Sequence, residues 1–144
     1  MFDPFGQARL GFDGVLGPGV TFGGSIGYAT FEQSLGASTS TVSEFVIVPR
    51  LGCMLGPSRY VGVWLRAGIG YARVKIDSDG SGVTQSAVDL VLDPMLIVTP
   101  LSHVGLTLGP SLNIGLGGSV RTNNLELDAT SSSYGLSAGL ALLF

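Results

Sequence analysis

The sequence predicts an all-β protein, an antiparallel up-and-down sheet that closes into a transmembrane β-barrel. Three observations support this fold class. Apolar residues recur at every second position in several segments, which is the period of a strand. Charged residues make up only 12% of the 144 residues, about half the usual share of a soluble domain, and the mean hydropathy is +0.49. Short turns and longer polar connections alternate along the chain, as they do in a meander of strands.

Seven segments carry the alternating pattern, each with one large apolar face and one face of small or polar residues. Their lengths are close to the roughly 9–11 residues that a tilted strand needs to cross a bilayer. In chain order they are Gln7–Leu16, Val20–Tyr28, Glu44–Leu55, Val61–Tyr71, Val88–Val98, Val104–Leu116 and Tyr134–Phe144. Three of them hold a proline on the apolar face. Proline has no backbone N–H to donate to the neighbouring strand, and the alternating pattern does not explain why proline stands at these positions.

The connections between these segments are of two kinds. Tight turns are expected on one side of the sheet, and longer loops rich in Ser, Thr, Gly and Asn are expected on the other. The turns are Gly17–Gly19, Gly56–Arg59 and Thr99–Ser102, and the loops are Ser34–Thr41, Asp77–Val83 and Gly117–Ala129.

Composition limits the classes of function. Residues 1–144 show no change of composition that would mark a second domain. The net charge of −3 and the seven dispersed Lys and Arg argue against a nucleic-acid partner. The longest uncharged stretch, Pro94–Val120, contains three prolines and cannot be a transmembrane helix. No signal peptide begins at Met1, and the single Cys53 forms no internal disulfide and is expected to act as a small hydrophobe.

The two faces of each strand predict two environments. Large apolar side chains need no complementary partner in lipid, whereas a narrow barrel has room inside only for small or well-paired side chains. A soluble sandwich would present a charged outer face, but the polar face here is mostly Gly, Ser, Thr and Asn. We therefore expect the apolar face to meet lipid. A soluble eight-stranded binding barrel with a lipocalin-like cavity remains an alternative.

Aromatic residues fall at the ends of the expected strands, where barrels collect them at the two membrane interfaces. The interface aromatics at the loop ends are Tyr28, Phe45, Tyr71 and Tyr134, and those at the turn ends are Phe22, Tyr60 and Phe144.

The last strand carries the most specific motif. Every second residue counted back from the end is apolar, and the chain ends on an aromatic residue: Tyr134, Leu136, Ala138, Leu140, Leu142 and Phe144. By this motif, and by the alternation from Gln7 onward, the chain resembles the small bacterial outer-membrane β-barrels, the eight-stranded class of the OmpA transmembrane domain and OmpX. In that family the terminal strand is the recognition signal for the outer-membrane assembly machinery. The resemblance implies the same role here.

Several charged residues lie at the alternate positions that form the small or polar face of the strands, which is the expected inner face of the barrel. They form a second candidate site. Three bases and four acids share it: Arg9, Arg50, Arg66, Asp13, Glu44, Asp89 and Asp93. An unpaired buried charge destabilises a protein strongly, so these side chains are expected to pair or to hold water. We expect a packed polar interior, and a narrow path for ions or small solutes is the alternative.

Enzymatic motifs are present but lack their context. Gly23–Gly27 and Gly135–Gly139 match the Gly-x-Ser-x-Gly pattern, yet neither precedes a helical segment. The pair Ser102–His103 superficially resembles the Ser–His pair of lipid-cleaving outer-membrane enzymes, but it lies at an expected tight turn. His103 is the only histidine, so a histidine-rich metal site cannot form. We expect no catalytic activity and no cofactor.

Taken with the resemblance, these features predict a monomeric, non-enzymatic protein of the Gram-negative outer membrane with a structural or surface-interaction role. Its expected partners are membrane lipid, lipopolysaccharide and, during biogenesis, the assembly machinery. Members of the family have an even number of strands and begin in the periplasm. Seven strands therefore predict that one strand, N-terminal to Met1, is missing from this chain. The alternatives are that seven strands close directly or that two chains pair through their edges.

Overall fold

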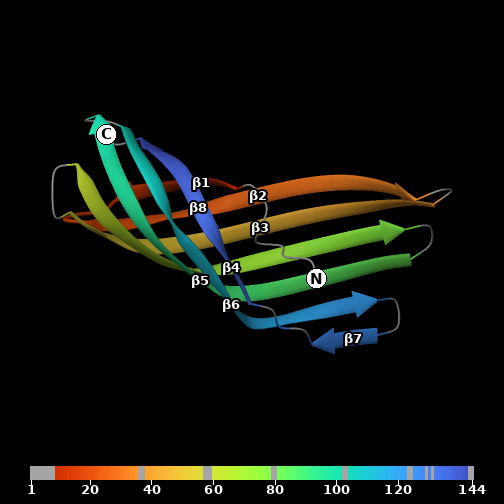
Figure 1. Cartoon of the computed structure of the whole chain (residues 1–144). Coiled ribbons are helices and arrows are strands. Elements are labelled where there is room, and N and C mark those ends of the chain that lie inside the picture. Colours follow the sequence, from red (N-terminus) through yellow and green to blue (C-terminus); the bar gives the residue numbers. More distant parts are fainter. Residues whose placement is uncertain are drawn as a thin grey trace.

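The computed structural model describes residues 9–35, 38–56, 60–78, 81–101, 104–122, 125–128, 130 and 132–142. They form one sheet of eight antiparallel strands (Figure 1). The strands are β1 (Leu10–Val15), β2 (Val20–Leu35), β3 (Ser38–Leu55), β4 (Val61–Ser78), β5 (Ser81–Leu101), β6 (Val104–Thr122), β7 (Leu125–Asp128) and β8 (Ser133–Leu142). Over these ranges no helix is long and apolar enough to cross a membrane.

The strands follow one another across the sheet in chain order. Strands β1 to β6 each pair with the next, and both β7 and β8 pair with β6. β7 lies beside Ser119–Thr122, and β8 lies beside Val104–Asn113, so the two short strands share one position in the sheet. The predicted all-β, antiparallel, up-and-down arrangement is confirmed. The seventh predicted strand is the β8 segment, and β7 is an additional strand.

The three predicted long loops are wrong over most of their length. β2 continues to Leu35, β4 continues to Ser78, and β6 continues to Thr122, and each pairs with the strand that follows it. These extensions are rich in Ser, Thr and Gly, with single apolar residues such as Val83 and Val120 between them. Thr is favourable in strands, so a polar composition alone does not indicate a loop. The hairpins project together at one end of the sheet in Figure 1.

The two edges of the sheet do not meet through hydrogen bonds. Within the described residues, β1 pairs only with β2, and β8 pairs only with β6. Direct closure by pairing of the first and last strands is therefore not seen. The predicted Gln7–Leu16 strand is described only from residue 9 onward, and Phe144 lies outside the described residues.

Burial separates the two faces as the alternation predicts. On β4 the residues Gly62, Trp64, Gly70, Ala72 and Val74 are buried, while the apolar residues between them are exposed. We call these the inner and the outer face. The fully buried core side chains, Val46, Val48 and Val91, all lie on the inner face.

Contacts across the inner face show that the sheet is strongly coiled. The Trp64 indole nitrogen on β4 donates a hydrogen bond of 2.9 Å to the Thr21 hydroxyl on β2. Arg66 on β4 lies 3.4 Å from Asp13 on β1, three positions across the sheet and about 14 Å away if the sheet were flat. The inner face is therefore concave, and its side chains meet across a narrow space.

The prolines on the apolar face now have a structural context. The β5–β6 ladder is interrupted between the Leu92–Leu112 and Leu96–Leu108 pairs, and by register Pro94 faces Pro110 in that interval. Both missing donors therefore fall in the same gap in the ladder. Pro49 lies in a similar gap between β3 and β4.

Glycines lie beside both gaps, where the neighbouring strands approach closely. A Cβ atom built on Gly109 would overlap the Pro94 carbonyl oxygen, and one built on Gly68 would overlap the Pro49 carbonyl oxygen. Glycine inside a strand often marks a tight bend of this kind. A proline on the outer face beside a glycine on the inner face thus accommodates the sharp curvature of the sheet.

The β1–β2 turn needs glycine for a different reason. Gly19 has a φ of +80°, which L side chains rarely adopt. The Leu16 N–H donates to the Val20 carbonyl over 2.8 Å and closes the turn, and the Met54 N–H donates to the Gly19 carbonyl over 2.6 Å. The second bond attaches the turn to β3.

The close approach at Gly109 can be tested by adding one methyl group. We expect Gly109→Ala to lower the free energy of unfolding by about 1–3 kcal/mol, because the added atom must displace a backbone carbonyl. Gly135→Ala is the control, because a Cβ atom there meets nothing within 4 Å. Urea unfolding in detergent micelles measures both, and equal stability of the two variants would contradict the close approach.

Candidate functional site

Four charged side chains form a closed ring on the inner face. Arg50 on β3 lies 3.2 Å from Asp93 on β5 and 3.5 Å from Asp13 on β1. Arg66 on β4 lies 3.4 Å from Asp13 and 3.5 Å from Asp93. Each arginine thus bridges both aspartates, and each aspartate bridges both arginines. We call Asp13, Arg50, Arg66 and Asp93 the charge ring.

The register explains why these four side chains meet. Asp13 is opposite Gly23, and Gly23 is opposite Arg50, so a glycine separates the two charges along one row of the sheet. Arg66 is directly opposite Asp93 on the neighbouring strand. Alternating long side chains with glycines lets the long ones lie over the small ones in a confined interior.

Two further glycines supply that space. A Cβ atom on Gly68 would lie 2.8 Å from the Arg50 side chain, and one on Gly52 would lie 2.8 Å from the Trp64 indole nitrogen. The Arg66 guanidinium lies 4.6 Å from the centroid of the Trp64 ring, close enough for a cation–π interaction. The glycines of the inner face therefore leave the space that the side chains of Arg50 and Trp64 occupy.

The ring is buried and electrically balanced. The exposed fractions of its side chains are 4% for Asp93, 7% for Asp13, 8% for Arg50 and 9% for Arg66. Two positive and two negative charges leave it neutral. The Ser111 hydroxyl on β6 also donates a hydrogen bond of 2.6 Å to the second carboxylate oxygen of Asp93. Paired in this way, the charges tolerate a site from which water is largely removed.

The other three predicted interior charges share the inner face but are not in the ring. Glu44 and Asp89 are buried at 2% exposure each, and Arg9 is half-buried next to β1. All three have interaction partners. The structure therefore brings four of the seven predicted residues together in one network and places the remaining three on the same face.

An apolar layer adjoins the ring inside the coiled sheet. Val46, Val48, Ala72, Ala87 and Val91 form a buried cluster contributed by β3, β4 and β5. The interior thus alternates an apolar layer with the charge ring. Such an arrangement brings β3, β4 and β5 together on the concave side of the sheet.

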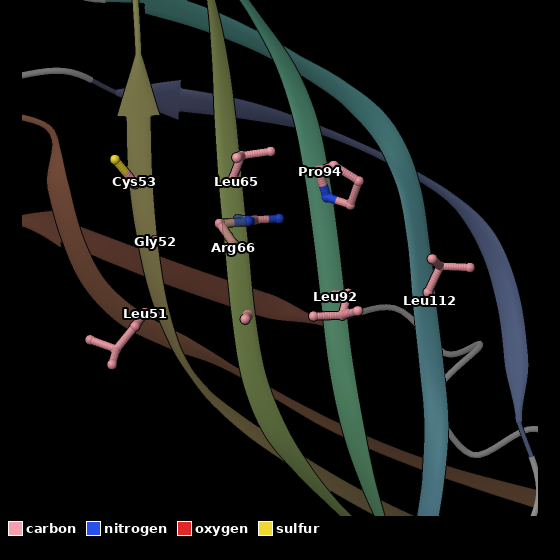
Figure 2. A pocket seen from close by; sticks show the side chains of 9 residues that line it. Leu51, Gly52, Cys53, Leu65, Arg66, Leu92, Pro94 and Leu112 are labelled. Carbon is pink, nitrogen blue, oxygen red and sulfur yellow. The ribbon is translucent and has the colours of Figure 1, made fainter.

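The outer face carries a groove, shown in Figure 2. Over the neighbouring strands β3 to β6, Leu51, Ala67, Leu92 and Leu112 lie in one row by register, and Leu65 and Pro94 lie in the next row along the strands. The groove has a volume of about 480 Å³ and is open and almost wholly apolar. Its chemistry suits a hydrocarbon chain lying on the surface, and Arg66 and Cys53 contribute only a small part of its lining.

Among the described residues, the predicted interface aromatics on β2, β3, β4 and β8 lie on the outer face, Tyr60 lies just before β4, and Phe144 is outside the described residues. Tyr28 is directly opposite Phe45, and Tyr71 is opposite both Ile47 and Val88. Tyr28, Tyr60, Phe22 and Tyr134 are all more than half exposed. Beyond Tyr71 the outer face of β4 changes to Arg73 and Lys75, so the aromatic residues stand where the apolar surface ends.

The serine motifs lie inside strands. Ser25 is a buried residue of β2, and Ser137 lies within β8. A nucleophile elbow requires a sharp turn from a strand into a helix, and neither serine has one. Ser102 and His103 lie outside the described residues. No group of three or more His, Cys, Asp or Glu among the described residues could hold a metal ion.

Sequence analysis missed Ser111, Trp64 and Thr21 as members of the interior network. Each of the three lies at an alternate position of the inner face, so the alternating pattern is sufficient to predict on which face of the sheet it lies. What it lacks is the register between strands, which decides that Ser111 meets Asp93 and that Trp64 meets Thr21.

The fold and site define a class: a coiled, up-and-down antiparallel sheet with a charged interior and an apolar exterior. Comparison of the chain with protein-family models, with curated proteins and with solved structures gives no match. The function must therefore be inferred from the geometry of the chain itself.

Neutralising one member of the ring tests its importance. We expect Asp93→Asn to lower the free energy of unfolding by about 3–5 kcal/mol, because two buried arginines would then share one carboxylate. Asp77→Asn removes the same charge from an exposed pair with Lys75 and is expected to cost about 0–1 kcal/mol. Urea unfolding in micelles gives both values. Equal losses would show that the ring contributes no more than a surface ion pair.

Proposed function

We propose that the protein is a transmembrane β-barrel of the Gram-negative outer membrane, non-enzymatic, with a packed polar interior. Its role is structural and surface-interactive: the apolar part of the sheet anchors the protein, and the polar hairpins extend from the membrane. The single observation that carries this proposal is the distribution of side chains between the two faces.

That distribution is the reverse of a soluble protein's. The buried polar and charged residues include Glu44, Arg50, Asp89 and Asp93, while most large apolar residues of the outer face are exposed. A soluble binding barrel with a lipocalin-like cavity would bury its apolar face and expose its charges. Exposed apolar surface of this extent marks contact with a membrane or another protein, and its spread over all the long strands favours a membrane.

The height of the apolar surface supports a bilayer. On β4 it runs from Val61 to Tyr71, beyond which Arg73 and Lys75 begin. Ten steps of about 3.3 Å give about 33 Å of strand. A tilt of about 40° reduces this to about 25 Å, the height of the apolar band of outer-membrane barrels. Tyr71 would then lie at the interface with the head groups.

The polar ends of the hairpins support a role outside the bilayer. Ser40 and Ser78 share a hydrogen bond of 2.7 Å between neighbouring strands, and Arg121 pairs with Glu126 at 2.8 Å. These contacts hold the hairpins extended without an apolar core. Arg73 and Lys75 lie just beyond the apolar surface, at the level where the phosphates of lipopolysaccharide would be.

The sequence of the last strand supports the choice of membrane. Tyr134, Leu136 and Leu140 are highly exposed on the outer face of β8, at 88%, 85% and 76%. The same alternation, ending on Phe144, is the feature by which the chain resembles outer-membrane barrels. The assembly machinery that reads such strands is therefore the expected partner during biogenesis.

A charge on the outer face tests the proposal. Leu108 is 56% exposed on β6, and we expect Leu108→Arg to lower the folding free energy in bilayers by about 2–4 kcal/mol. Leu125→Arg makes the same change on β7, beyond the apolar surface, and is expected to cost about 0–1 kcal/mol. Folding into phosphatidylcholine vesicles followed by urea titration measures both. Equal tolerance at the two sites would refute a membrane-embedded outer face.

The packed interior leads to a prediction about conduction. We expect no porin-sized steps when the pure protein is inserted into planar bilayers, because the charge ring and the apolar layer fill the space between the strands. Current recordings at both polarities provide the measurement. Stable large steps would support the alternative of a channel and would overturn the packed interior.

A further inference from the structure

The polarity of the two faces reverses in the hairpins beyond Tyr71. On the outer face, the row that contains Lys75 consists of hydroxyl and charged residues: Thr30, Ser43, Lys75, Thr84, Arg121 and Glu126. On the inner face, the next row along the strands is apolar except at Thr122: Phe31, Val42, Ile76, Val83, Thr122 and Leu125. We call this inner set the apolar row.

The apolar row is open to solvent. Phe31 is 53% exposed, Ile76 36% and Leu125 59%. One inner row closer to the charge ring, Glu44 and Val74 are only 2% exposed. The apolar row is therefore a surface above a closed layer, and covering it would remove apolar area from water, which is favourable.

The shape of the apolar row limits what can cover it. It crosses six neighbouring strands, β2 to β7, and five spacings of about 4.8 Å give a length of about 24 Å. One inner position occupies two residues of strand, about 7 Å. The resulting area, about 170 Å², is far below the roughly 800 Å² that each partner contributes to a stable protein interface. A second copy or another folded protein would need much more surface, whereas a single extended chain fits.

The chemistry of the apolar row decides between two kinds of extended chain. A peptide would bring a backbone N–H and C=O at every residue, and within the row only the Thr122 hydroxyl could meet them. Polar groups that lose water without a partner are costly. A hydrocarbon chain has no such groups, so it is the occupant that the row favours.

We propose that the apolar row binds one unbranched hydrocarbon chain, the acyl or alkyl part of an amphiphile, lying across β2 to β7 on the inner face of the hairpins. The polar head of the amphiphile stays in water. This site is additional to the proposed membrane anchor and separate from the outer-face groove, because it lies on the opposite face and beyond the level of Tyr71.

The test uses palmitic acid that carries a diazirine near the end of its chain, added to the protein folded in phosphatidylcholine vesicles. Irradiation couples the probe to the residues beside it, and mass spectrometry of peptides locates the adducts. The probe also enters the bilayer, so adducts around Leu108 on the outer face serve as an internal reference. We expect adducts on the hairpin peptides that contain the apolar row as well as around Leu108.

Two neighbouring residues of β4 provide a matched pair of variants. Ile76→Ser removes an apolar side chain from the row, and we expect it to lower the hairpin adducts about fivefold relative to those around Leu108. Lys75→Ser changes the adjacent residue on the opposite face and is expected to leave them unchanged. Val83→Ser, directly opposite Ile76 on β5, should repeat the loss on a second strand.

Other results would overturn the proposal. Adducts around Leu108 without any on the hairpins would show that the row binds no hydrocarbon chain, and equal losses in Ile76→Ser and Lys75→Ser would show adsorption without a site. Ile76→Cys in a Cys53→Ser background tests the second copy, because thiol cross-links between copies at that position would assign the row to an interface. Hairpin adducts without any around Leu108 would instead leave the site standing and refute the membrane location, so the two failures are distinguishable.

Discussion

The charge ring requires that strands far apart in the sheet face each other across a narrow space. Asp13 on β1 can contact Arg66 on β4 and Arg50 on β3 only when the sheet is tightly coiled. Once the sheet is coiled, the inner face has little room, and its other positions must be small, apolar or paired. The ring, the glycines opposite it and the apolar layer beside it are therefore consequences of the same curvature. The large side chains that have no room inside are all left on the outer face.

The same curvature gives a role to residues that usually weaken strands. Proline removes a ladder donor and glycine removes a side chain, and either alone would be unfavourable in a central strand. Here Pro94 and Pro110 share one interruption of the ladder, and Gly109 lies beside it where the strands approach closely. A regular, flat ladder would resist such bending. The interruptions locate the bend at particular rows and leave the rest of the ladder continuous.

The alternation of residue types was sufficient to predict the apolar part of seven strands and the face on which its side chains lie, because both depend only on the period of two. It could not predict the register, since register is a relation between segments far apart in the chain. For that reason all seven interior charges could be assigned to one face, but not the ring that joins Asp13, Arg50, Arg66 and Asp93. The hairpin extensions were missed because Ser and Thr suit a loop in water and a strand in water equally well. The prolines could not be explained from the sequence either, because only the register shows that Pro94 lies opposite Pro110 in one gap of the ladder.

The long strands pass through two environments, and their two faces change accordingly. Near the turns, β4 alternates buried small or paired residues with exposed apolar ones, and beyond Tyr71 its outer face becomes basic. β3 and β5 flank it and extend with Ser, Thr and Gln in the same region. Backbone pairing continues across this boundary without a break on β4 and β5. A hairpin of polar residues alone is marginally stable in water. These hairpins continue strands whose register is already fixed by the charge ring. The coiled part of the sheet therefore stabilises the hairpins. The interior that holds the sheet together thereby also positions the surface that extends from it.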